Sequence, residues 1–345
     1  MADSIVKPAS VELLDMPMLQ PSSDFSRWRE RQFNRLIQWI TRRQARGWAE
    51  MMDHQQHAQL AESVREFRDA RAKEAAVKPV LMDDAFRDTI REPVIDGLGE
   101  WISAKTAPDD AAILYVPGGA FIMKRSDRMT ALAARLARMA DARLRIADYR
   151  LAPEHPCPAA VDDVESALLG LYDDGYAPEK TVVACDSAGG SIALAALLRL
   201  KSRGVPMPAG LAMFSPWLDL ALTGYSLLSS GLSGVSPFTM EMTALCARLY
   251  LQDKVLAIEP DASPIFGDLS GLPPMLVHVS QEDSFFDDSK LLAKRIKEVD
   301  GRMLMRVWPM GGHVWEHEFS TDADKSIQET ARFIRGCFEG ADMLY

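Results

Sequence analysis

The sequence has few cysteines, no long apolar run and no excess of positive charge. Its four cysteines, Cys157, Cys185, Cys246 and Cys337, lie far apart, so they predict no metal cluster and favour reduced intracellular thiols. No block of about 18 apolar residues is present, which argues against a transmembrane helix. The first residues lack the basic start and apolar run of a secretory signal. A formal net charge of −10 argues against a nucleic-acid partner, and we predict a soluble cytoplasmic protein.

Strand-like and helix-like segments alternate through most of the chain. Its 345 residues, 48% of them hydrophobic, are sufficient for a large core. The strand candidates are short apolar runs at residues 111–116, 145–149, 181–184, 210–214, 275–279 and 303–307. Helical patterns occur between them at residues 129–140, 159–172, 191–203 and 289–299. This alternation predicts an α/β fold with a mostly parallel, doubly wound sheet, preceded by a hairpin over residues 92–103.

Residues 182–190 have the pattern of a strand, a tight turn and a helix, with Ser187 at the turn. Such a turn presents a nucleophilic serine above the end of a parallel sheet. The strained backbone requires small residues two positions away on either side. Gly189 meets this requirement, whereas Cys185 occupies the position where glycine is usual. A serine hydroxyl is a weak nucleophile near neutral pH, so it needs a base and an acid.

Three histidines follow the serine and are candidates for the base. His313 lies on a Gly-rich loop after the strand candidate 303–307, so it can reach the C-terminal edge of the sheet and accept the serine proton. His278 lies within a strand candidate and is expected to be a buried structural histidine. His317, four residues after His313, is expected to be exposed in the following helix.

One loop between the serine and the base contains a cluster of carboxylates at residues 281–288. Asp283 is closest to the end of the preceding strand, and we favour it as the acid that orients the imidazole. Asp287 and Glu282 are the alternatives. Asp287 and Asp288 are expected to begin the next helix, where carboxylates interact favourably with the helix dipole and need no catalytic role.

A segment of small residues follows the first core strand candidate. Residues 117–121 read Pro-Gly-Gly-Ala-Phe, and small residues let backbone N–H groups approach a ligand closely. We expect N–H groups of this segment, together with that of Ala188, to stabilise the negative charge that develops on an attacked carbonyl oxygen. Each such donor is worth about 3 kcal/mol.

Several specific motifs occur together in the chain. They are Tyr-Arg-Leu-Ala-Pro-Glu-His-Pro at residues 149–156, Asp-Ser-Ala-Gly-Gly at 186–190, Ala-Ser-Pro at 262–264, Leu-Pro-Pro at 272–274 and the acidic loop. The chain thereby resembles, over roughly residues 92–333, the hormone-sensitive-lipase-like bacterial carboxylesterases of the α/β-hydrolase superfamily. The resemblance implies an eight-stranded sheet with a helical cap, in which Ser187 is the nucleophile, Asp283 the acid and His313 the base. In the family's His-Gly-Gly-Gly motif the last two glycines donate, and the matching residues are Gly119 and Ala120.

Three positions depart from the family pattern. The histidine of the His-Gly-Gly-Gly motif is Pro117, the third glycine is Ala120, and the glycine before the Asp-Ser pair is Cys185. Ala120 keeps its N–H group and Pro117 loses only its own, so no required donor is missing. The absent imidazole would have braced the loop, so we expect the loop to be looser or held by another group. We expect a changed rate or substrate preference rather than an inactive site.

The N-terminal stretch differs in composition from the rest of the chain. Residues 24–48 contain seven arginines, and Phe33, Leu36, Ile37 and Ile40 have the spacing of an amphipathic helix; a second helical stretch follows. One interpretation is a basic surface for a membrane or a partner. The other is a cap helix laid over the catalytic core, with its arginines solvated or ion-paired. We favour the cap, because the stretch also contains Glu and Gln and its apolar residues fill one face; a membrane partner is not expected.

The chain is predicted to have two parts, a helical cap segment at residues 1–78 and a catalytic domain at residues 79–345. Residues 223–253, a Gly/Ser-rich loop followed by an apolar helix, are predicted to be an insertion that belongs to the cap. Cap residues are expected to shape the acyl and alcohol pockets, among them Phe25, Trp28, Trp39 and residues 227–250.

The predicted function is hydrolysis of small to medium carboxylic esters through an acyl-serine intermediate, with no cofactor or metal. The altered oxyanion loop keeps open a second hypothesis, a non-catalytic small-molecule receptor on the same fold. A third keeps the mechanism but changes the bond to an amide, lactone or carbamate, which the sequence does not distinguish from an ester. The resemblance also makes a homodimer possible, through an edge strand or a late helix.

Overall fold

A computed structural model describes residues 11–15, 24–74, 78–94, 99–252, 254–309 and 311–341. These residues contain one sheet of nine strands in the order β1-β9-β8-β7-β6-β4-β5-β3-β2. The strands are β1 (Val11–Asp15), β2 (Thr89–Pro93), β3 (Gly99–Ala104), β4 (Ala112–Val116), β5 (Arg143–Ala147), β6 (Thr181–Asp186), β7 (Gly210–Phe214), β8 (Met275–Ser280) and β9 (Met303–Trp308). All neighbours pair in parallel except β2 with β3 and β3 with β5, which confirms the predicted mostly parallel sheet.

The central strands are buried along their whole length. Every residue of β4, β6, β7 and β8 is buried, because helices cover both faces of a parallel sheet and leave no polar face. The register places Val116 opposite Cys185 and Asp186 opposite Phe214. The C-terminal ends of β4, β6 and β7 therefore lie side by side, and the loops that follow them begin at the same edge of the sheet.

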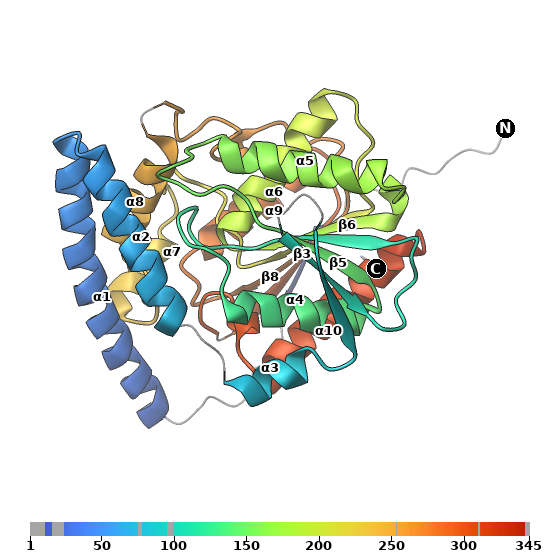
Figure 1. Cartoon of the computed structure of the whole chain (residues 1–345), viewed down its shortest axis with the longest axis horizontal. Helices are drawn as coiled ribbons and strands as arrows, with labels where there is room; N and C mark the ends of the chain where they lie inside the picture. Colours follow the sequence, from blue (N-terminus) through green and yellow to red (C-terminus); the bar gives the residue numbers. More distant parts are fainter. Residues whose placement is uncertain are drawn as a thin grey trace.

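Helices cover both faces of this sheet (Figure 1). One face carries α5 (Ala159–Asp173), α6 (Ala188–Ser202) and α9 (Phe286–Glu298), and the other carries α4 (Asp127–Ala140) and α10 (Thr321–Phe338). Each side has its own buried apolar cluster: Leu194 and Leu292 belong to one, Leu132 and Ile327 to the other. The predicted doubly wound arrangement is therefore confirmed.

The two edges of the sheet differ in how well the sequence predicts them. At one edge β2 and β3 form the predicted hairpin, with Thr89 opposite Ala104. The turn expected within this hairpin, at Asp96-Gly97, lies outside the described residues. At the other edge β1 pairs in parallel with β9, Val11 opposite Met303. This ninth strand is an addition to the eight expected, and it comes from the stretch assigned to the cap.

Four helices lie together beyond the end of the sheet (Figure 1). They are α1 (Asp24–Asp53), α2 (His57–Glu74), α7 (Ser226–Ser233) and α8 (Met240–Leu251). Two ion pairs join α1 to α8, Arg42 with Glu241 at 3.4 Å and Asp53 with Arg248 at 2.7 Å. A short helix, α3 (Pro79–Ala85), leads from this group into the hairpin. Residues 24–74 and 226–251 are thus neighbours in space although they are distant in the sequence.

The first half of the face of α1 that packs against the protein is polar, contrary to the expectation of an apolar inner face, whereas Ala45 and Trp48 further along are buried in the apolar core. The amides of Asn34 and Gln38 are buried and donate hydrogen bonds to backbone carbonyl groups at the end of α7 and in the turn after it. The last carbonyl groups of a helix have no hydrogen-bond donor within that helix. The amides of Asn34 and Gln38 supply such donors, which apolar side chains cannot do. Phe33, Leu36 and Ile40 of the predicted apolar stripe are exposed instead.

Residues 226–233 form a helix, which includes the first half of the Gly/Ser-rich run at residues 229–237 that is predicted to be a loop. The run Ser-Leu-Leu-Ser-Ser-Gly-Leu-Ser has weak helix propensity. The carboxylate of Asp287 accepts hydrogen bonds from the N–H groups of Tyr225 and Ser226, at 2.7 and 2.9 Å, at the start of the helix. This tertiary contact compensates for the weak local preference.

Candidate active site

Ser187 lies at a sharp turn between β6 and α6, as the strand–turn–helix pattern predicts. Its φ of 50° is a left-handed conformation that is strained for a residue with a side chain. A Cβ atom at Gly189 would lie 2.2 Å from the carbonyl oxygen of Val116, so that position requires glycine. Cys185, on the other side, is fully buried in β6 and packs as a small apolar side chain.

In the structure the imidazole of His313 lies between Ser187 and Asp283 and contacts both side chains. Nε2 of His313 lies 2.8 Å from Oγ of Ser187, and Nδ1 lies 3.1 and 3.2 Å from the two carboxylate oxygens of Asp283. The Asp283 side chain is fully buried and that of His313 is 7% exposed. When Nδ1 donates its proton to the carboxylate, Nε2 is the acceptor that faces the serine hydroxyl.

The other carboxylates of the acidic loop have different contacts. Asp287 holds the start of α7 and pairs with Lys290, whereas Asp288 accepts hydrogen bonds from the N–H groups of Leu218 and Asp219 at 2.7 and 2.9 Å. Both lie in the first turn of α9, as expected. Asp283, rather than Asp287 or Glu282, is the carboxylate hydrogen-bonded to the imidazole.

His278 has the structural environment that its place in a strand predicts. It is buried in β8, and its Nδ1 accepts a hydrogen bond of 3.0 Å from Nε1 of Trp308. Burial lowers the pKa of His278 to about 3, so this imidazole is neutral near pH 7.

His317 is not the exposed helical residue that the sequence predicts. It ends a 3₁₀ turn, η3 (Trp315–His317), and its side chain is 17% exposed. Val314 adopts a left-handed conformation with φ of 48° and turns the chain, so that α10 begins only at Thr321. Nε2 of His317 lies 3.6 Å from Oδ2 of Asp186, and burial lowers the pKa of this histidine. His317 is therefore held beside the serine turn.

The loop after β4 provides backbone donors that have no acceptor in the described part of the chain. Gly119 has a φ of 120°, and a Cβ atom there would lie 2.7 Å from the carbonyl oxygen of Met123, so the position requires glycine. Ala120 continues the turn with a φ of 51°. No hydrogen bond among the described residues uses the N–H groups of Gly119, Ala120 or Ala188. Gly119 and Ala120 line the same cavity as Ser187, where these donors can reach a bound oxygen atom.

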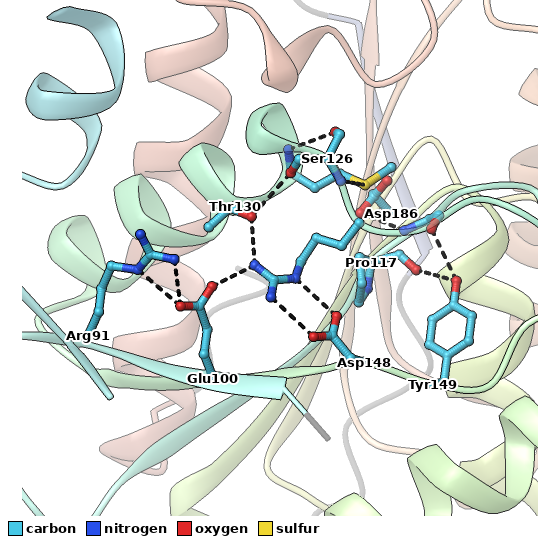
Figure 2. A network of polar contacts seen from close by, with 11 residues as sticks. Arg91, Glu100, Pro117, Ser126, Thr130, Asp148, Tyr149 and Asp186 are labelled. Carbon is cyan, nitrogen blue, oxygen red and sulfur yellow. Dashed lines mark hydrogen bonds and ion pairs between the residues drawn. The ribbon is translucent and has the colours of Figure 1, made fainter. Parts of the chain in front are cut away.

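Other side chains hold this loop in place of the family's histidine. The hydroxyl of Tyr149 donates toward the carbonyl groups of Pro117 and Gly118, at 2.8 and 3.1 Å (Figure 2). Oδ1 of Asp186 accepts hydrogen bonds from the N–H group of Gly118, at 3.0 Å, and from the hydroxyl of Tyr115. Burial raises the pKa of both tyrosines, so both hydroxyls stay protonated and donate. The loop start is thus fixed by residues whose role the sequence alone does not reveal.

Arg125 fixes the far end of the same loop through its contacts with Glu100, Thr130 and Asp148. Its guanidinium donates to both carboxylate oxygens of Asp148, at 3.0 and 3.1 Å, and to Glu100 and Thr130, at 2.5 and 2.7 Å. Glu100 also accepts hydrogen bonds from Arg91 on the neighbouring strand. The loop between β4 and α4 is therefore anchored to the sheet at both ends.

A mainly apolar cavity of about 410 Å³ contains the serine and the imidazole. The segments beyond the sheet supply much of its wall, including Ile37, Thr41, Phe67, Phe238, Met242 and Cys246. The ring of Phe238 stands edge-on to that of His313, with the centroids 5.0 Å apart. Trp28 and Trp39, expected to shape the pockets, are instead 55% and 62% exposed. The side chain of Phe25 lies outside the described residues.

Arg68 of α2 is a site residue that the sequence pattern does not reveal. It is 5% exposed, forms two ion-pair contacts with Glu154 at 2.6 and 2.9 Å, and donates to the backbone carbonyl groups of Ile122 and Ala152. Glu154 belongs to the Tyr-Arg-Leu-Ala-Pro-Glu motif, so this motif fastens α2 beside the cavity. Other arginines surround Arg68 in the sequence, and nothing local distinguishes it from them.

Known proteins with similar sequences share this fold. Residues 113–317 match the α/β hydrolase fold family. An acetyl-hydrolase from Streptomyces hygroscopicus is 32% identical over 238 residues, which cover 68% of this chain and 79% of the relative. An esterase from Acinetobacter venetianus is 34% identical over 210 residues, which cover 61% and 69% of the two chains.

Solved structures give the same result. The crystal structure of an esterase from the bacterial hormone-sensitive lipase family matches with a TM-score of 0.70 and 32% identity, over 80% of this chain and 98% of the other. A structure of EstE5 soaked with p-nitrophenyl butyrate matches with a TM-score of 0.69 and 30% identity, over the same shares of the two chains. The chain belongs to the α/β hydrolase fold family. Within that family its neighbours are the bacterial hormone-sensitive-lipase-like esterases, and its activity is carboxylic-ester hydrolysis.

Proposed function

We propose that the chain hydrolyses small to medium acyl esters through an acyl intermediate on Ser187, with His313 as the base and Asp283 as the acid that orients it. The observation that carries this proposal is the 2.8 Å contact between Nε2 of His313 and Oγ of Ser187, with Asp283 on the opposite side of the ring. A non-catalytic receptor needs no hydrogen-bonded series of serine, histidine and aspartate, so the presence of this series counts against that alternative.

Acylation begins when Oγ of Ser187 attacks the ester carbonyl carbon while its proton passes to Nε2 of His313. The carbonyl oxygen becomes negative, and we assign its stabilisation to the N–H groups of Gly119, Ala120 and Ala188, at about 3 kcal/mol for each donor. The Asp283 carboxylate stabilises the imidazolium. The carbon–oxygen bond to the leaving group then breaks, and Nε2 gives its proton to the departing alkoxide.

Deacylation repeats the sequence with water as the nucleophile. Nε2 of His313 removes a proton from water, and the resulting hydroxide attacks the acyl carbon. The bond to Oγ breaks, the carboxylic acid leaves, and Ser187 regains its proton from the imidazolium. The chain's own side chains carry each proton, so the cycle uses no cofactor.

We further infer that residues 24–74 and 223–253 act as the cap of a catalytic domain that begins near residue 79. Their side chains line the cavity, and Ile37, Phe67 and Met242 give it an apolar wall suited to an acyl chain. The use of p-nitrophenyl butyrate with a similar esterase supports a short acyl group. Reduced, buried cysteines support the predicted cytoplasmic location. A homodimer stays a prediction, which light scattering tests.

The test combines an active-site label with turnover. A fluorophosphonate probe and p-nitrophenyl butyrate are applied to the wild type, to Ser187→Ala and to Ser202→Ala, an exposed serine at the end of the same helix. We expect labelling and turnover to disappear only in Ser187→Ala. Equal labelling of the Ser187→Ala variant would overturn the assignment. A parallel panel of a lactone, an anilide and a carbamate decides which bond is cleaved fastest.

A further inference from the structure

The outer face of α1 carries a row of exposed large apolar side chains. Phe33, Leu36, Trp39 and Ile40 are exposed by 61%, 54%, 62% and 46%. These residues, here called the outer stripe, recur at helical spacing and share one side of α1. The helix lies at the outer boundary of the molecule (Figure 1). Single exposed apolar residues are normal on protein surfaces, whereas a contiguous row indicates a binding surface.

The same helix is strongly basic in an acidic protein. Residues 31–49 contain five arginines and no Asp or Glu, whereas the whole chain has a formal charge of −10. Arg42 pairs with Glu241. Four further arginines are exposed and form no ion pair with any residue that the structure describes: Arg31, Arg35, Arg43 and Arg46. The outer stripe is therefore flanked by positive charge that no residue described by the structure neutralises.

We propose, contrary to the sequence-based expectation of no membrane partner, that the outer stripe of α1 docks on the surface of an anionic lipid membrane. An interfacial helix combines an apolar face that includes Trp, Phe or Leu with arginines whose charge attracts anionic headgroups. A second copy of the chain fits less well, because stripe-to-stripe packing would bring two sets of unneutralised arginines together. Among the described residues, no helix combines the length and apolar character needed to cross a bilayer, so the contact is at the surface.

The docked orientation would place the catalytic cavity close to the lipid. Ile37 and Thr41, on the inner side of α1, line the cavity that contains Ser187. The outer face of α1 would therefore contact the proposed membrane, while its inner side lines the cavity that contains Ser187. Esters that partition into the bilayer would then be the most accessible substrates, a consequence that rests on the proposed function, whereas membrane binding itself does not.

Binding is measured by co-sedimentation of the full chain, in a Ser187→Ala background that leaves the lipid intact. Vesicles of phosphatidylcholine alone are compared with vesicles that also contain phosphatidylglycerol, at low and high salt. We expect binding to the anionic vesicles that weakens with salt. Leu36→Ser/Trp39→Ser and Arg43→Glu/Arg46→Glu should each reduce the partition coefficient by about tenfold or more. Leu256→Ser/Ile258→Ser is the matched control, since those residues are 66% and 59% exposed elsewhere.

Three outcomes would overturn the proposal. The first is no binding of the parent protein to anionic vesicles at low salt. The second is an equal loss in the Leu256/Ile258 control, which would indicate nonspecific adsorption. The third is a dimer, seen by light scattering, that Leu36→Ser/Trp39→Ser converts to a monomer, because the stripe would then be covered by a second copy. If the wild type does not hydrolyse esters, the proposed function is contradicted, whereas the result on membrane binding stands.

Discussion

The helix α6 and the first half of α1 are attached to the protein by opposite means. In α6, which follows Ser187, Ile192 and Leu194 are fully buried, and nearly the whole helix is covered. In α1 the buried side chains up to Thr41 are polar, the outer stripe points to solvent, and apolar burial begins only with Ala45 and Trp48. Apolar packing stabilises α6 in proportion to the area it buries. The inner hydrogen bonds of α1 contribute only about 1 kcal/mol each, so the first half of α1 opens at lower cost than α6.

This contrast assigns different consequences to changes in the two regions. Ser187, Asp283 and His313, the proposed triad, lie on loops that follow strands of the buried sheet, so changes there should affect the chemical step. The proposed cap lines the cavity, so changes there should affect substrate binding and local opening. The expected effects below run from the largest to the smallest.

Asp283→Asn should lower kcat for p-nitrophenyl butyrate by about 10⁴, because the imidazole would lose its preferred tautomer and the stabilisation of its charged form. KM should change little. Asp287→Asn is the matched control on the same loop; it should perturb α7 and keep kcat within about tenfold of the wild type. Steady-state kinetics decide between them, and an equal loss of kcat in both variants would contradict the role given to Asp283.

Arg68→Met should release α2 from the Tyr-Arg-Leu-Ala-Pro-Glu motif at a local cost of about 2 kcal/mol, since it breaks a partly buried, charge-assisted pair of hydrogen bonds with Glu154. KM should rise more than kcat falls, and amide exchange in α2 should accelerate. Arg65→Met removes an exposed pair with Glu62 and should cost less than about 1 kcal/mol. Unchanged exchange in α2 of the Arg68 variant would show that the cap is held by other contacts.

Glu316→Gln tests a buried carboxyl group in η3, next to His317. Burial raises the pKa of Glu316 from 4.5 to about 8, although Ser326 donates to it. Between these values the folded state keeps a proton that the unfolded state has lost, so the stability from this group is full below pH 4.5 and declines as pH rises to about 8. The glutamine variant should therefore gain stability over the wild type from pH 5 to pH 8, by on the order of 1 kcal/mol or more. Urea unfolding at both pH values measures this; an equal difference at both would contradict it.

Gln38→Ala should have the smallest effect, about 1 kcal/mol or less, confined to α1. Its amide donates to the carbonyl groups of Gly231 and Ser236 at 2.9 and 2.7 Å, and truncation leaves both without that donor. Hydrogen exchange along α1 should accelerate while α6 stays protected. Gln32→Ala, at an exposed position of the same helix, is the control and should leave exchange unchanged. Faster hydrogen exchange in α6 as well would mean that α1 and α6 unfold as one unit.

The sequence was most informative where local pattern and burial coincide. The central strands were predictable because strands covered on both faces are continuous apolar runs, as in β4 and β6. Ser187, Asp283 and His313 could be named because each follows such a strand, and strand ends converge at one edge of the sheet. The hairpin of β2 and β3 had a similarly local signal.

The failures occur where a distant partner decides the local structure. The helix at residues 226–233 depends on Asp287, some sixty residues later in the chain. The burial of His317 depends on the left-handed turn at Val314. The inward face of α1 depends on carbonyl groups at the end of α7, which no periodicity of α1 encodes. The ninth strand, β1, depends on an available edge of β9.

The amino-acid pattern by itself determined the α/β fold, the positions of Ser187, Asp283 and His313 after successive strands, and the membership of an esterase family, because these follow from short-range spacing along buried strands. Only the tertiary structure decided which tyrosines and carboxylates hold the loop after β4, which arginine fastens α2, and which side of α1 meets solvent. These contacts are hydrogen bonds between donors and acceptors that are far apart in the chain, and the local sequence does not indicate where the acceptors lie.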